Sequence, residues 1–194
     1  MTSLPASTFV PIALGFFGLG TGYLIWGPQE LFGFPPRDPS VDRSMGLWGV
    51  FLPGLCQAVT GIILFVGLTW FQVFKNDPAL YMAAVAFSAY GIHWFALGWN
   101  RYQENDARPN VGMSFAFTLL SVLGAIVFFH ADDWPVGLLF CGLAVVYVSE
   151  AVASVGARVG VRALGLAHLL TGLWLMYLST AVILDLAAGF SLRK

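Results

Sequence analysis

The sequence predicts an all-α membrane protein, a six-transmembrane-helix bundle that forms a single domain over residues 1–194. Apolar residues make up 58% of the chain and charged residues only 10%, whereas a soluble domain carries about 25% charged residues. The apolar residues gather in six runs, each long enough to cross a bilayer as a helix. We therefore expect lipids to surround the chain and its function to lie within or between the helices.

Several classes of function find no support in the sequence. A net charge of −1 gives no sign of a nucleic-acid partner. The chain contains no Ser-His-Asp set, zinc-ligand spacing or phosphate-binding loop. We therefore expect neither an enzyme nor a bound metal or cofactor.

The first two apolar runs differ in composition and length. The first, about 8–26, is rich in glycine, and Gly18 and Gly22 have the spacing that lets helix backbones approach closely. A proline-rich loop is expected over 27–44. The second run, about 45–74, exceeds the roughly 20 residues that a bilayer needs. We expect this helix to tilt or to finish along the membrane interface.

The other four runs are separated by short polar turns. They predict helices over about 79–99, 111–129, 134–155 and 163–186. The basic stretch 156–162 is expected to be a turn. Because the residues before the first run include no Lys or Arg, they lack the basic region of a signal peptide. We therefore expect the first run to stay as a span.

Basic residues divide unevenly between the two sides of this topology. Six lie in the first, third and fifth loops: Arg37, Arg43, Arg101, Arg108, Arg158 and Arg162. Three lie on the opposite side: Lys75, Arg193 and Lys194. Because cytoplasmic loops carry the excess of basic residues, we predict that the odd-numbered loops are cytoplasmic and both termini are outside.

The third run carries polar side chains at membrane depth, in the stretch 87–94. Polar groups inside hydrocarbon need partners, so they are functional-site candidates. Tyr90 either lines a solute path or donates a hydrogen bond to a neighbouring helix. His93, three residues later, shares a helix face with Tyr90 and either relays a proton or bonds a backbone carbonyl.

Three further polar residues lie in apolar runs. Gln57 either orients a carboxylate or an amide, or holds two helices together. Glu150 and His168 are candidate proton carriers, together with His93. Glu150 lies near the basic stretch 156–162, so a solvated position at the membrane interface is the alternative for its carboxylate.

Three motifs support a comparison with a known family. Residues 10–15 read Val-Pro-Ile-Ala-Leu-Gly, residues 54–61 place Gln57 between glycines, and residues 87–94 read Phe-Ser-Ala-Tyr-Gly-Ile-His-Trp. They resemble the Asn-Pro-Ala-Pro-Leu-Gly, glycine-flanked Gln and Phe-Thr-Ser-Tyr-Gly-x-x-Trp patterns of the acetate and succinate transporter family. This six-span group includes the bacterial acetate–succinate permease and yeast ammonium/acetate export proteins, and it shares its architecture with acid-gated urea and amide channels.

The resemblance implies a homohexamer in a bacterial plasma membrane, with one narrow path through each six-helix protomer. The positions that match the family's constriction are Leu19, Tyr90 and Val146, and Phe87 belongs to the same motif as Tyr90. Gln57 is expected to line the path with them. Val182 stands where the family has a glutamate, so that residue's role is missing here.

These observations lead to a channel-like transporter for a small solute, a monocarboxylate such as acetate, with succinate as a further candidate. Since an unpaired carboxylate is costly in a medium of low dielectric constant, proton coupling follows as a mechanism. The alternatives are a urea, amide or ammonia channel, and a structural subunit of a larger membrane complex.

Overall fold

The structure is a computed structural model that describes residues 10–74 and 76–192. The expected start of the first span at residue 8 and the basic residues Lys75, Arg193 and Lys194 lie outside the described residues. All regular secondary structure in the described part of the chain is helical. The all-α prediction is therefore confirmed.

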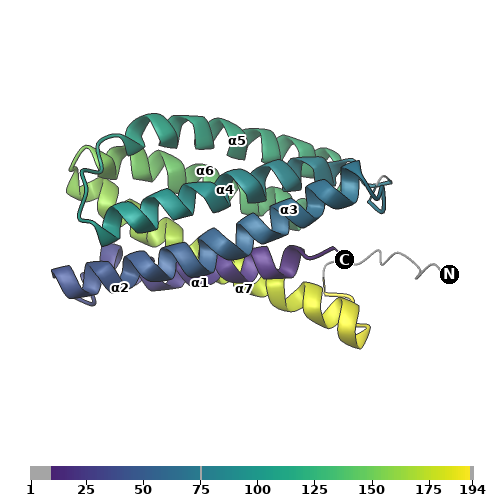
Figure 1. Cartoon of the computed structure of the whole chain (residues 1–194), viewed down its shortest axis with the longest axis horizontal. Helices are drawn as coiled ribbons and strands as arrows, with labels where there is room; N and C mark the ends of the chain where they lie inside the picture. The colour runs from purple at the N-terminus through teal and green to yellow at the C-terminus, as the bar shows by residue number, and fades with distance from the viewer. Residues whose placement is uncertain (1–9, 75, 193–194) are drawn as a thin grey trace.

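The described residues form six long helical units that run back and forth (Figure 1). The elements in chain order are α1 (Ile12–Phe32), α2 (Pro39–Gly49), the π-helical segment η1 (Val50–Gly54), α3 (Leu55–Thr69), α4 (Ala79–Tyr102), α5 (Asn110–His130), α6 (Trp134–Ser154) and α7 (Arg158–Ala188). Because α2, η1 and α3 follow without a break, they make one continuous unit.

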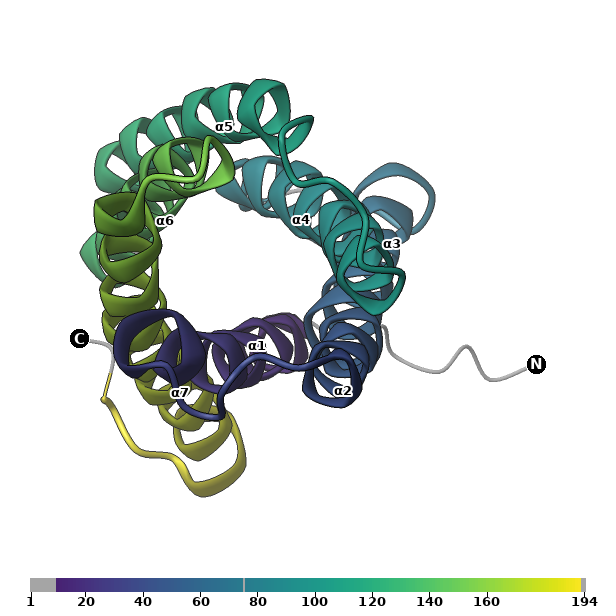
Figure 2. The same cartoon turned by 90° about the vertical axis from the view of Figure 1, so that its left-hand side faces the viewer.

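The helices close into a ring when viewed along the bundle (Figure 2). α1 packs against α7, α7 against α6, and α6 against α5. α4 packs along α2, η1 and α3, which return to α1. The contact between α4 and α5 is the smallest between neighbours in the ring, so this seam depends most on individual side chains.

Within the described residues, five helical units are long and apolar enough to cross a membrane, namely 39–69, 79–102, 110–130, 134–154 and 158–188. α1 is long enough at 21 residues but is not among them. Its glycines and the polar run at Gln29 and Glu30 lower its hydropathy. The six-helix bundle is thus confirmed. One of its helices, α1, is held in the ring by packing against its neighbours.

The first loop is much shorter than the sequence predicted. α1 continues through Pro28 to Phe32, and α2 begins at Pro39. Asp38 caps α2 by accepting hydrogen bonds from the backbone N–H groups of Ser40 and Val41, at 2.8 and 3.0 Å. The hydrogen bond from the Ser40 side chain contributes most to lowering the pKa of the Asp38 carboxyl.

Two other predicted boundaries are wrong. The second span ends at Thr69, and the exposed Trp70 and Phe71 follow it outside any helix. Its excess length lies instead at the start, because the proline and the cap at Asp38 begin the helix early. The stretch 156–162 is also not a turn throughout, since α7 begins at Arg158.

The glycine face of α1 packs inside the protomer. A Cβ atom on Gly18 would lie 2.4 Å from Cβ of Cys56, and one on Gly22 would lie 2.7 Å from Cγ of Pro53. The GxxxG spacing therefore brings α1 against η1 and α3. At these two glycines, this face serves packing within the protomer.

We predict that Gly18→Leu destabilises the bundle, because the new side chain would have to displace Cys56 and the backbone at Leu52. Overpacking of this kind costs about 1–3 kcal/mol. Scanning fluorimetry of the purified protein should show a lower unfolding temperature. Gly112→Leu on α5 is the matched control, because nothing lies within 4 Å of a Cβ atom there. Equal unfolding temperatures for the two variants would contradict the packing argument.

Candidate functional site

Two cavities reach into the bundle from its opposite ends. The first has a volume of about 260 Å³ and extends inward from the end that holds Asp77 and Asp133. The second has a volume of about 220 Å³ and extends inward from the end that holds Arg37 and Asn105. The odd-numbered loops therefore surround the second cavity.

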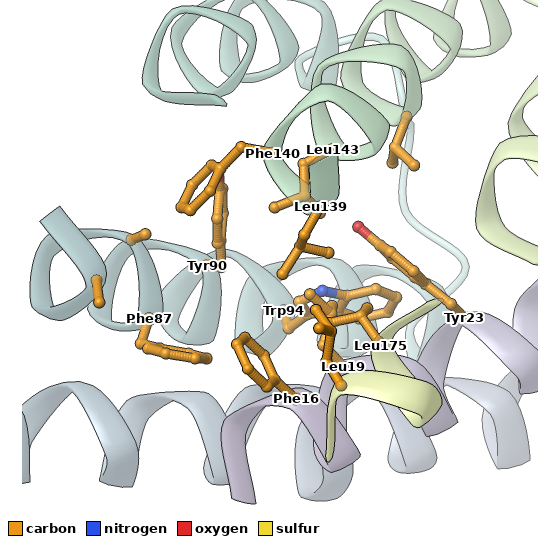
Figure 3. Close-up of a cluster of buried hydrophobic side chains, with 14 of the residues drawn as sticks. Phe16, Leu19, Tyr23, Phe87, Tyr90, Trp94, Leu139, Phe140, Leu143 and Leu175 are labelled. Atoms are coloured by element: carbon orange, nitrogen blue, oxygen red, sulfur yellow. The ribbon is translucent and has the colours of Figure 1, made fainter. Parts of the chain in front are cut away.

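The cavities are separated by a barrier of buried side chains from α1, α4 and α6. Tyr23, Trp94 and Tyr147 are each at most 2% exposed, as is Val146. The rings of Tyr23 and Trp94 lie 5.9 Å apart between centroids. Figure 3 shows these two residues beside Leu19, which lines the first cavity. The structure is thus closed at its centre.

One face of each of three helices runs through all three zones. On α1 the sequence of contacts is Leu19 in the first cavity, Tyr23 in the barrier and Trp26 in the second cavity. On α4 the corresponding residues are Tyr90, Trp94 and Leu97, and on α6 they are Leu143, Val146 and Glu150. Spacings of three and four residues place each set on one helix face. The cavities and the barrier therefore lie along a common axis.

Gln57 lies where the first cavity meets the α3 wall. It is fully buried, and neither its Nε2 nor its Oε1 atom has a hydrogen-bond partner among the described residues. The Nε1 atom of Trp94 in the barrier is also without a partner there. Buried polar groups are nearly always hydrogen-bonded, so these atoms suit a polar solute. Interhelical bonding of Gln57, the other reading, finds no partner atom in the described residues.

The ring and the hydroxyl of Tyr90 make contacts in different parts of the bundle. Its ring lines the first cavity, beside Phe140 (Figure 3). Its hydroxyl lies 2.9 Å from Oγ of Ser121 on α5. Because Ser121 donates its own hydrogen to the carbonyl of Phe117 at 2.7 Å, the tyrosine is the donor. The hydroxyl therefore joins α4 to α5, while the ring forms part of the wall of the first cavity.

His93 lies behind this wall and belongs to the lining of neither cavity. Its ring packs on Phe117 and Tyr147, at centroid distances of 4.8 and 5.5 Å. Tyr90 packs on the same two rings, so the expected shared face is confirmed. Nδ1 lies 3.5 Å from the Tyr147 hydroxyl, while Nε2 has no partner in the described part of the chain.

The second cavity holds the buried carboxylates. Glu150 is 8% exposed and accepts a hydrogen bond of 3.3 Å from Nδ2 of Asn110, so its carboxyl group is buried in the wall of this cavity. Oε2 of Glu30 lies 2.6 Å from Nδ1 of His168. Glu30 was not among the predicted site residues, because Gly27-Pro28 is typical of the end of a helix. Its spacing of four residues from Trp26 is the signal that it continues the same face.

A charged cluster that the sequence did not predict surrounds the mouth of the second cavity. Arg101 donates to Asp42 from Nε and Nη2, at 3.1 and 2.9 Å. It also donates to Oε1 of Gln29 and lies over the Trp26 ring at 4.4 Å. Arg37 donates to the other oxygen of Asp42 at 3.0 Å. The cluster ties α1, α2 and α4 together at this end.

The predicted site residues thus fall into separate groups. Leu19, Gln57, Phe87 and Tyr90 line the first cavity together. Val146 belongs to the barrier, and Glu150 lines the second cavity. His168 lies beside the barrier through its stacking on Tyr23, at 4.4 Å between centroids. Val182 lines the first cavity, so this wall is apolar where the family has its glutamate.

Comparison with known proteins finds a similar solved structure. No protein-family model matches the sequence, and no curated protein matches it. The structure is similar to that of the bacterial acetate channel SatP, with a TM-score of 0.75 and 16% sequence identity, over 93% of this chain and 95% of that chain. The chain has the fold of this channel. The resemblance inferred from the three motifs is therefore confirmed in the fold.

We predict that Tyr90 and Ser121 stabilise the α4–α5 seam together. Tyr90→Phe and Ser121→Ala should each cost about 0.5–1.5 kcal/mol, the net contribution of a hydrogen bond. The double variant should cost less than the sum of the two, because the first change already removes the shared bond. Equilibrium unfolding in mild detergent measures the free energy of unfolding of the native protein, the two single variants and the double variant. Strict additivity would contradict the bond.

Proposed function

We propose that this protein is a channel-like transporter that carries a small monocarboxylate such as acetate along the axis of its bundle. The observation that supports this most directly is the continuous lining face on α1, α4 and α6, which passes from one cavity through the barrier to the other. A passage opens once the side chains of the barrier move apart, with no change in the order of the helices.

The side chain of Gln57 favours a neutral solute. A protonated carboxylic acid matches a primary amide twice, because its carbonyl accepts from Nε2 and its hydroxyl donates to Oε1. A carboxylate has no hydrogen to offer Oε1 and would leave that atom unpaired. The residues described as lining the first cavity include no Lys or Arg and include Asp77 and Asp133. The acid therefore enters this cavity protonated.

Proton coupling follows from the same chemistry. The acid carries its proton through the apolar first cavity, and the titratable groups beyond the barrier are there to receive it. Glu150 lines the second cavity and His168 contacts Glu30 there, whereas His93 packs on Phe117 and Tyr147 and is not among the lining residues of either cavity. We keep all three as candidates for proton transfer within this proposal.

The setting of the protein is part of the proposal. We propose that it is integral to a bacterial plasma membrane, with its odd-numbered loops cytoplasmic and its termini outside. The second cavity would then face the cytoplasm. We further propose a homohexamer, in which the exposed apolar faces of the outer helices contact lipid and neighbouring protomers, such as Phe115 and Ile126 on α5.

A second candidate function is a channel for urea or another small amide. Gln57 supports this as well, because an amide solute donates to Oε1 and accepts from Nε2 in the same arrangement. Ammonia is a third small neutral solute of this candidate class. The solutes differ in their dependence on pH: between pH 5 and 7 the neutral fraction of a carboxylic acid falls as the pH rises, that of ammonia rises, and that of urea or an amide does not change.

We predict that proteoliposomes containing the protein take up acetate faster than succinate or urea, and that acetate uptake rises as the external pH falls. Gln57→Leu should reduce acetate uptake about tenfold, the effect of losing roughly 1.4 kcal/mol of hydrogen bonding. Gln103→Leu is the matched control, because Gln103 is exposed and lines neither cavity. Uptake of urea alone would favour the amide channel, and no uptake of any solute would favour the structural subunit.

We also predict that Tyr90→Ala widens the passage, because the ring forms part of the first cavity's wall. Uptake of butyrate relative to acetate should rise several-fold, while Tyr90→Phe keeps the ratio of the native protein. Size-exclusion chromatography checks that both variants assemble. If Tyr90→Ala assembles and leaves the ratio unchanged, the ring does not limit the passage.

A further inference from the structure

Glu30 and His168 form a buried pair at the inner end of the second cavity. Nδ1 of the imidazole lies 2.6 Å from Oε2 of the carboxylate. The side chain of His168 is 3% exposed and that of Glu30 is 12% exposed. Glu30 lines the second cavity, while the imidazole stacks on Tyr23 of the barrier. The pair therefore connects the barrier to the cavity.

The close approach of α1 and α7 positions this pair. A Cβ atom on Gly165 would lie 2.5 Å from the backbone nitrogen of Leu31 and 2.8 Å from Cβ of Glu30. Only glycine allows the helices to meet at this distance. Because α1 continues past Pro28, the carboxylate of Glu30 reaches the imidazole, which lies on α7 less than one turn beyond Gly165.

The charged and titratable groups around the pair come from three helices. Tyr23 on α1 stacks on the imidazole. Glu150 on α6 and Arg101 on α4 line the second cavity together with Glu30. His93 on α4 packs on Tyr147 of the barrier. Arg101 is itself paired with Asp42, which also binds Arg37. The imidazole thus contacts one carboxylate, that of Glu30, a second carboxyl group lines the same cavity, and the guanidinium of Arg101 is already paired.

This arrangement suits a group that gains and loses a proton. Imidazole changes charge near neutral pH. When the imidazole is neutral, its Nδ1–H donates to Glu30, and the lone pair of Nε2 is the site that accepts a proton. The carboxylate of Glu30 then stabilises the imidazolium that forms. A buried carboxylate held against one nitrogen fixes the ring's orientation and leaves the other nitrogen to react.

We propose that the Glu30–His168 pair accepts the proton of the transported acid on the second-cavity side of the barrier, an inference that rests on the proposed acid transport. The O–H bond of the neutral acid breaks, and its proton forms an N–H bond at Nε2 of His168. The carboxylate product keeps the electron pair and leaves through the second cavity. The imidazolium later returns the proton to water in that cavity. Glu30 is a positioning residue that stays ionised throughout.

Acetate uptake into proteoliposomes, divided by the concentration of neutral acid, tests the proposal. In the native protein this normalised rate should rise between about pH 5.5 and 7.5, as the imidazole becomes free to accept a proton. Glu30→Gln and His168→Gln should remove the rise and lower the rate at pH 7 about tenfold or more. Glu30→Asp, which keeps the charge, should restore part of the rise. Glu104→Gln is the matched control, because Glu104 is exposed and lines neither cavity.

A spectroscopic measurement on the purified protein needs no solute. Nitrogen-15 NMR of the imidazoles, with His168 assigned from its loss in His168→Gln, should show a neutral ring and an imidazolium in proportions that change between pH 5 and 8. At pH 6 the imidazolium signal should be weaker in Glu30→Gln than in the native protein.

The outcomes separate this inference from the proposed function. A native protein that takes up no acid overturns both. Native acid uptake with an unchanged rate and pH profile in Glu30→Gln overturns the inference alone. So does a His168 ring whose protonation stays constant over this pH range, whatever the uptake measurements give.

Discussion

The close contact of α1 with the helices on both sides is the constraint on which the rest of the structure depends. Gly18 and Gly22 bring α1 against η1 and α3, and Gly165 brings α7 against α1. These contacts hold α1 in the ring, although it is not among the helices that are apolar enough to cross a membrane by composition. They also fix the direction of its inner face, on which Leu19 lines the first cavity and Glu30 lines the second.

The two ends of the bundle differ in whether they contain a cluster of paired, buried charges. Arg101 is largely buried, and such a cation is tolerable only when it is fully paired. Asp42, Gln29 and the Trp26 ring supply that pairing from α1 and α2. The described lining of the first cavity contains no comparable cluster, and its inner part is apolar apart from Gln57 and Tyr90. The buried charges at the second-cavity end are therefore paired with one another, whereas the inner part of the first cavity offers no charged partner.

Sequence patterns predicted the helices better than the side-chain partners. Long apolar runs fix the existence of a membrane helix, because only helices satisfy the backbone inside a bilayer. The partner of the Tyr90 hydroxyl, Ser121, lies on another helix, and no local pattern links the two. Glu30 was missed for a local reason, since Gly27-Pro28 is typical of a helix end yet here lies inside α1. Only tertiary packing determines the first contact, whereas the second follows from a helix that continues through a proline.

The two cavities differ in polarity, so the proposed path favours the neutral acid at one end and its separated proton and carboxylate at the other. A neutral acid loses little hydrogen-bonding energy on entering the first cavity. The amide of Gln57 offers it two hydrogen bonds in place of two that it makes with water. Ionisation there would create an unpaired charge in an apolar wall. Beyond Tyr23 the environment changes within one or two helical turns to one that contains Glu30, His168 and Arg101. Separation of proton and carboxylate is therefore favoured only after the barrier, where each product meets polar groups and water.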